Sequence, residues 1–99
     1  MSITGARFTL GHVVCTSRVN DVIAEDSKFA KFVMESLGRH VSGDWGDLCK
    51  SDKKENEYAL GKYLRLLSSY TYDKTKRIWV ITEADRSSTC VYCFRRSIK

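Results

Sequence analysis

The chain has 99 residues, a formal net charge of +5, an apolar fraction of 42% and a charged fraction of 29%. These values are typical of one small globular domain, so we predict a single α+β domain over residues 1–99. No apolar run approaches the roughly 20 residues of a membrane span, and the first residues lack the pattern of a secretory leader, so we expect a cytoplasmic protein that does not contact a membrane.

The first part of the chain predicts one strand followed by two helices. Residues 7–16 contain β-branched residues and predict a strand, and residues 19–25 predict a short helical turn. Asp26 or Ser27 can cap a longer helix, which we expect to stop at Gly38. Apolar residues spaced by three and four give this helix one buried face: Phe29, Phe32, Val33 and Leu37.

A loop rich in glycine and acidic residues follows the long helix and divides the chain. Its central residues are Gly43, Asp44, Trp45, Gly46 and Asp47. Two glycines around a tryptophan predict a tight turn that one large buried ring anchors to the core. We therefore interpret this loop as a structural motif.

A third helix is predicted directly after that loop. Asp52 and Glu55 match a capping box, in which each side chain satisfies a free backbone donor at the helix start. The helix then spans about residues 53–60 and stops at Gly61, and Tyr58 and Leu60 are expected to face inward.

The last part of the chain predicts a meander of three strands. Residues 64–72, 77–83 and 88–94 are rich in aromatic and β-branched residues and are separated by polar turns. In the second of these turns, Asp85 is expected to cap backbone amides and Arg86 to pair with a carboxylate. The predicted fold is a three- to four-stranded antiparallel sheet with two or three helices packed on one face.

Positive charge is concentrated in the strand-rich part of the chain. Residues 1–61 carry a net charge of −1, whereas residues 62–99 carry +6. Aromatic residues interleave with arginines in this basic part, a pattern found both in protein interfaces and in sheets that bind single-stranded nucleic acid. The arginines that we predict to bind a partner are Arg65, Arg77, Arg86, Arg95 and Arg96.

Three groups of residues raise the alternative of a metal site or an enzyme. Cys90 and Cys93 have the spacing of a zinc or redox pair, but in a strand they point to opposite faces. The carboxylates of residues 44–57, with His40 and His12, could serve a small metal-dependent hydrolase. Capping and ion pairs account for the same carboxylates, so we predict no catalytic residue, no metal and no cofactor.

Several segments of the chain together resemble one protein family. Residues 8–16, the RHVSGDWGD segment at 39–47, Asp52, residues 56–60 and 65–68, and the ITEADRS segment at 81–87 occur in the order typical of that family. It comprises short uncharacterised bacterial proteins carried on plasmids, integrative elements and phages, some of which are labelled type I restriction subunit M. The chain departs from the family after residue 89, where a basic end replaces an acidic one that contains proline.

The resemblance implies a bacterial mobile element as the setting of this protein. Such elements carry small proteins that disable host defence. The leading hypothesis is therefore a non-enzymatic inhibitor, anti-CRISPR or anti-restriction, that binds a nuclease or a nucleoprotein surveillance complex in the cytoplasm of the bacterial host cell. A nucleic-acid-binding accessory or regulatory protein of the element is the second hypothesis. A methyltransferase subunit is not expected, because these 99 residues lack a cofactor-binding α/β domain and its glycine-rich loop.

Overall fold

The computed structural model describes residues 5–95 of the chain. In chain order its elements are β1 (His12–Cys15), α1 (Ser17–Glu25), α2 (Ser27–Val41), α3 (Lys50–Lys62), β2 (Leu66–Thr71), β3 (Lys76–Thr82) and β4 (Ser88–Arg95). This order of one strand, three helices and three strands confirms the predicted α+β fold. Within the described residues no helix is both long enough and apolar enough to cross a membrane.

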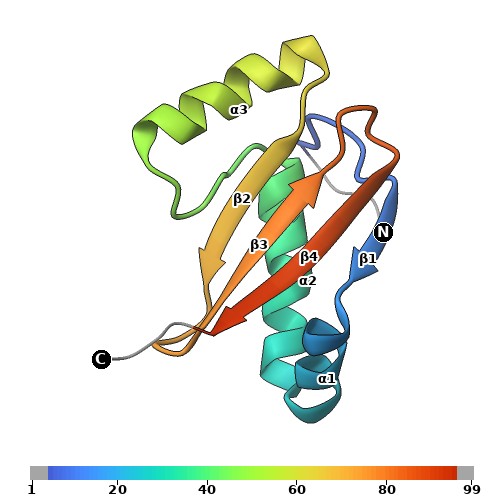
Figure 1. Ribbon diagram of the computed structural model, residues 1–99, viewed down its shortest axis with the longest axis vertical. Helices are drawn as coiled ribbons and strands as arrows, with labels where there is room; N and C mark the ends of the chain where they lie inside the picture. The colour runs from blue at the N-terminus through green and yellow to red at the C-terminus, as the bar shows by residue number, and fades with distance from the viewer. Residues whose placement is uncertain (1–4, 96–99) are drawn as a thin grey trace.

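The four strands form one mixed sheet in the order β1-β4-β3-β2. The last three strands pair antiparallel, as a meander predicts, with Ser69 opposite Trp79 and Trp79 opposite Tyr92. The sheet is not wholly antiparallel, however, because β1 pairs parallel to β4. After β1 the chain passes through the helices and two strands, so β4 returns in the direction of β1 (Figure 1).

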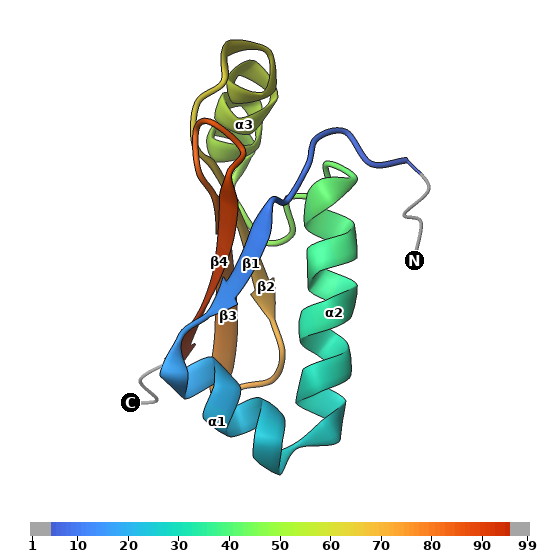
Figure 2. The ribbon, with the colours of Figure 1, turned by 90° about the vertical axis from the view of Figure 1, so that its right-hand side faces the viewer.

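Two of the helices cover one face of the sheet. Figure 2 shows α1 and α2 on the same side, while α3 lies at the end of the sheet near the start of β2. Within residues 5–95 no helix covers the opposite face. The core between helices and sheet is formed by Val19, Phe29, Val33, Leu37, Tyr70, Ile78, Val80 and Val91.

The start of α2 agrees with the prediction, but its end does not. Asp26 is the N-cap, and its carboxylate accepts hydrogen bonds from the amides of Lys28 and Phe29. The helix continues through Gly38 to Val41 because His40 and Val41 are fully or almost fully buried. Their burial outweighs the roughly 1 kcal/mol that glycine costs in a helix interior.

The predicted capping box at the start of α3 is wrong. The helix begins at Lys50 after an N-cap at Cys49, so Asp52 lies inside the first turn, and the Cys49 side chain makes no capping hydrogen bond. Asp52 is still placed where a carboxylate interacts favourably with the helix dipole. The helix also runs past Gly61 and ends at Tyr63, which has a left-handed φ of 52°. Tyr58 is 62% exposed and does not face inward.

Candidate binding face

The loop at residues 43–47 fastens α2 to the edge of β2. Gly43 and Gly46 have φ values of 87° and 73°, which favour glycine, and Trp45 between them is only 3% exposed. The amide of Ser69 donates to the carbonyl of Trp45, and the carbonyl of Ser69 accepts from the amide of Asp47. The loop thus adds a short parallel bridge to the sheet, which agrees with the structural interpretation of this segment.

Both acidic residues of this loop bind neighbouring groups of the same chain. Asp44 forms an ion pair with Arg39 at 2.7 Å and accepts a hydrogen bond from the amide of Gly46. The Arg39 hydrogen bond, with the Gly46 amide, lowers the pKa of Asp44 below its ordinary value. Asp47 accepts a hydrogen bond from the hydroxyl of Thr71 on β2. The two carboxylates therefore close the loop and do not converge on a common site.

A third carboxylate, Glu57 on α3, fixes the tryptophan of the loop. One of its oxygens accepts a hydrogen bond from the indole N–H of Trp45 at 2.8 Å. The guanidinium of Arg7 donates to both of its oxygens, and this pairing is the main cause of the lowered pKa of Glu57. Sequence reasoning missed this contact, because 50 residues separate Arg7 from Glu57 and neither belongs to a local pattern.

His40 is fully buried at the centre of a chain of polar side chains. Its Nδ1 atom contacts the hydroxyl of Ser68, and its Nε2 atom lies 2.9 Å from the hydroxyl of Thr82. The Thr82 hydroxyl contacts that of Thr89, which donates to the carbonyl of Leu10 at 2.7 Å. This chain of hydrogen bonds joins α2 to β2, β3 and β4, and it ends at the segment before β1.

The direction of this hydrogen-bond chain fixes the form of the imidazole. A hydroxyl has one hydrogen, and that of Thr89 is used on Leu10, so Thr82 must donate to Thr89. His40 Nε2 then carries the hydrogen that Thr82 accepts, and Nδ1 accepts from Ser68. Burial, together with the charge of Arg86, lowers the pKa of His40 to about 3. The side chain is a neutral structural histidine that solvent does not reach.

Arg86 lies inside the domain and, within residues 5–95, donates to backbone carbonyls and not to a carboxylate. It is 9% exposed, and its guanidinium donates to the carbonyls of Ala59, Leu64, Glu83 and Ala84. Its carbon Cζ lies over the rings of Phe8 and Tyr63, at 5.8 and 5.4 Å. The prediction that Arg86 belongs to an exposed docking surface therefore does not fit the structure, whereas Asp85 caps the amide of Ser87 as expected.

We expect Arg86→Lys to destabilise the fold by about 1–3 kcal/mol although it keeps the positive charge. An ammonium group cannot reach carbonyls on both α3 and the β3–β4 turn, so buried acceptors lose their donor. Urea unfolding at neutral pH measures this loss. The matched control is Arg65→Lys, at an exposed arginine paired with Glu83, which should change stability by less than about 0.5 kcal/mol. Equal effects of the two changes would contradict the buried role of Arg86.

Cys90 and Cys93 lie in β4 and point to opposite faces of the sheet, as the sequence predicts. Cys93 packs against the main core, whereas Cys90 pairs with Ile81 and shares the outward face with it. Burial raises the pKa of the Cys93 thiol. Within residues 5–95 no three metal-binding side chains are grouped in a way that could hold an ion.

The sheet face that the helices leave uncovered is formed by alternate residues of all four strands. Strand pairing places Val14, Cys90, Ile81 and Leu67 in one row across the sheet, and Tyr92, Trp79 and Ser69 in the next. Val14 is 51% exposed, and Trp79 and Tyr92 are 38% exposed each. We refer to the side chains in these two rows, with Arg65, Arg77 and Glu83, as the outer face.

The aromatic residues of the last three strands, which are close together in the sequence, lie on opposite faces of the sheet. Tyr70 is fully buried, and Tyr72 packs against Phe29 and Phe32 on the helix side of the sheet. Trp79 and Tyr92 instead lie opposite each other on the two central strands and point outward. A period of two in the strands predicts this division, but only once the strand register is known.

Two of the predicted partner-binding arginines lie on the outer face. Arg65 forms an ion pair with Glu83 across the strands at 3.1 Å. Arg77 is half-buried, and its Nε atom is buried without a hydrogen-bond partner among the described residues. Arg95 pairs with Lys76 at the end of β4, but its side chain and all of Arg96 lie outside what the structure describes.

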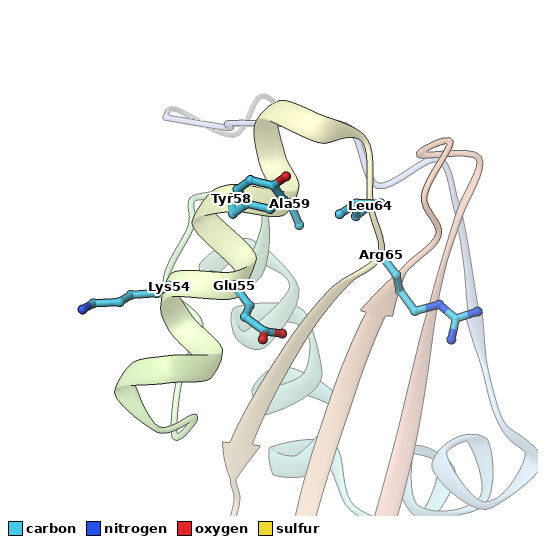
Figure 3. Close-up of a pocket in the computed structure, with 6 residues that line it drawn as sticks. All are labelled: Lys54, Glu55, Tyr58, Ala59, Leu64 and Arg65. Atoms are coloured by element: carbon cyan, nitrogen blue, oxygen red, sulfur yellow. The ribbon is translucent and has the colours of Figure 1, made fainter.

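A groove of about 570 Å³ adjoins the outer face between α3 and the start of β2. Figure 3 shows its lining, with Tyr58 and Glu55 on the helix and Leu64 and Arg65 on the facing segment. Tyr58 and Leu64 are 62% and 48% exposed. Arg65 belongs both to this groove and to the outer face, so the two form one continuous surface.

Comparison with known proteins gives no match: no protein-family model, no curated protein and no solved structure is similar enough to place this chain in a family.

Proposed function

We propose that this protein is a non-enzymatic inhibitor of a bacterial defence system, of the anti-CRISPR or anti-restriction kind. It binds a nuclease or a surveillance complex through the outer face and blocks its action. The observation that carries the proposal is a four-stranded sheet with one face covered by helices and the other face bearing exposed Trp79, Tyr92 and Val14. Exposed aromatic and arginine side chains of this kind are the residues that dominate binding energy in interfaces.

The roles of the residues that sequence analysis considered for catalysis also favour a binding protein. His40 is enclosed in the core, and Asp44 and Asp47 are bound to Arg39 and Thr71. These groups stabilise the fold around the loop at residues 43–47. The family that the sequence resembles is carried on mobile elements. Because such elements carry proteins that disable host defence, we place the partner in a host defence system.

An interference assay tests the proposal. Cells that carry one defence system and a matched targeted phage or plasmid are given the protein in trans, and the survival of the target is measured. We expect protection in at least one CRISPR or restriction system, and loss of protection with the double variant Trp79→Ala, Tyr92→Ala.

The control for this assay is Met34→Ala, at an exposed apolar residue of α2 away from the outer face. This variant should protect as well as the unchanged protein does. Absence of protection across all systems assayed would overturn the proposal, and full protection by the double variant would remove the outer face from it.

A further inference from the structure

We infer that the outer face binds single-stranded nucleic acid by stacking bases on Trp79 and Tyr92. This inference deepens the proposed function, since it names the component of a nucleoprotein complex that the face contacts: a guide strand or a displaced single strand. The proposed ligand is single-stranded nucleic acid in general, whichever defence system supplies the strand.

The placement of the two aromatic rings is the first ground for this inference. They lie on the two central strands, β3 and β4, and are direct cross-strand neighbours. Side chains opposite each other in an antiparallel pair have Cβ atoms about 5 Å apart, a spacing on the scale of neighbouring bases in an extended strand. Sheets that bind single strands use rings on adjacent central strands in this way, with the helices on the far face.

The charge around these rings is the second ground. Arg77 lies on the outer face one row beyond Trp79, and Arg65 lies beyond the other row. Arg77 is half-buried, so the accessible part of its guanidinium offers a positive charge that can pair with a backbone phosphate. Glu83, just after β3, is the one carboxylate among the residues that define the outer face, and it forms an ion pair with Arg65, so Arg77 leaves these residues with a net positive charge.

The chemistry of this face favours a single strand over a duplex. It also predicts binding that depends little on the base sequence. A flat sheet face with exposed rings can stack only on bases that are already unpaired. Ring stacking accepts every base, because each base has a π-face. We therefore expect binding to thymine-rich DNA and uracil-rich RNA alike, with little binding to a duplex of equal length.

Fluorescence anisotropy with labelled oligothymidylate, oligouridylate and a DNA duplex tests the inference directly. Trp79 also serves as an internal reporter, because the second tryptophan, Trp45, is buried and bases stacked on Trp79 should quench its emission. Trp79→Ala or Tyr92→Ala should weaken single-strand binding by about fivefold to a hundredfold. Arg77→Ala should weaken it too and lower the slope of log affinity against log salt by about one.

Matched controls come from the other surfaces of the domain. Met34→Ala removes an apolar side chain that is 59% exposed on α2, and Lys31→Ala removes a charge from α2 whose side chain is 80% exposed. Neither change should alter single-strand affinity by more than about twofold. Circular dichroism of every variant shows whether the fold is kept.

Each outcome separates the inference from the proposed function. Absence of single-strand binding at low salt, or binding that the outer-face variants leave unchanged, overturns the inference. If the protein still protects a target in cells and captures a complex stripped of nucleic acid, the proposed function stands and the face contacts protein. If single-strand binding is confirmed but no defence system is inhibited, the proposed function fails and a role on the element's own nucleic acid replaces it.

Discussion

Gly46→Ala should lower the stability of the domain by about 3–5 kcal/mol. The residue has a φ of 73°, and a Cβ at this position would overlap the carbonyl oxygen of Ser69 and crowd the ring of Tyr70. Backbone strain accounts for about 1–2 kcal/mol of this loss, and the rest comes from displacing the loop from the edge of β2. For a domain of this size, Tm should fall by more than about 10 °C in a thermal unfolding experiment.

The matched control for this change is Gly61→Ala. Gly61 is exposed within α3, and no atom lies within 4 Å of an added Cβ. Alanine there should stabilise the domain by up to about 1 kcal/mol, because glycine is costly in a helix interior. If the two substitutions shift Tm in the same direction, the close contact between Gly46 and Ser69 does not anchor the loop.

The buried histidine should make the domain sensitive to acid. The pKa of His40 is lowered from 6.5 to about 3 in the folded state, so between these values the unfolded chain binds a proton that the folded chain does not. Stability is therefore complete above about pH 6.5 and falls as the pH decreases, by at most about 1.4 kcal/mol per pH unit. Urea unfolding in a pH series should show a loss of about 2–3 kcal/mol by about pH 4.5.

His40→Leu isolates this contribution. The variant should be less stable at neutral pH, because the hydroxyls of Ser68 and Thr82 lose their buried partner. Its stability should then change much less between about pH 6.5 and 4.5, while His12→Leu, at an exposed histidine, should keep the slope of the unchanged protein. The lowered pKa values of Asp44 and Glu57 add a loss in the same direction, but mainly at lower pH.

Nuclear magnetic resonance of the unchanged protein tests the same histidine if the variant does not fold. The imidazole nitrogen shifts should indicate the neutral form with hydrogen on Nε2, and they should not titrate above about pH 4. A midpoint near pH 6.5 would contradict the buried position of the ring and the direction of its hydrogen bonds.

The sequence predicted those parts of the fold that depend on local patterns. The apolar spacing of Phe29, Val33 and Leu37, the cap at Asp26 and the aromatic and β-branched run of β3 each depend on neighbours within a few residues, and each is confirmed. The glycines around Trp45 likewise indicated a buried ring in a tight turn. Such features are encoded by short spacings that one sequence displays.

The parts that were missed depend on distant contacts. Gly38 and Gly61 were expected to end their helices, but the burial of Val41 and the contacts at Tyr63 extend both. The guanidinium of Arg86 reaches carbonyls on α3, which nothing near it in the sequence indicates. The outer face could not be assembled beforehand, because the choice of outward residues depends on register and on which side α1 and α2 pack.

The parallel pairing of β1 with β4 has a consequence for how the chain is made. His12 pairs with Ser88, so the first strand finds its partner only after the chain has left the ribosome as far as β4. Loop closure over such a sequence separation is slow, and the nascent chain exposes the unpaired edge of its first strand until β4 emerges. This domain can therefore be completed only after β4 has been made, and a ribosome stalled before β4 should hold a chain that protease cleaves readily.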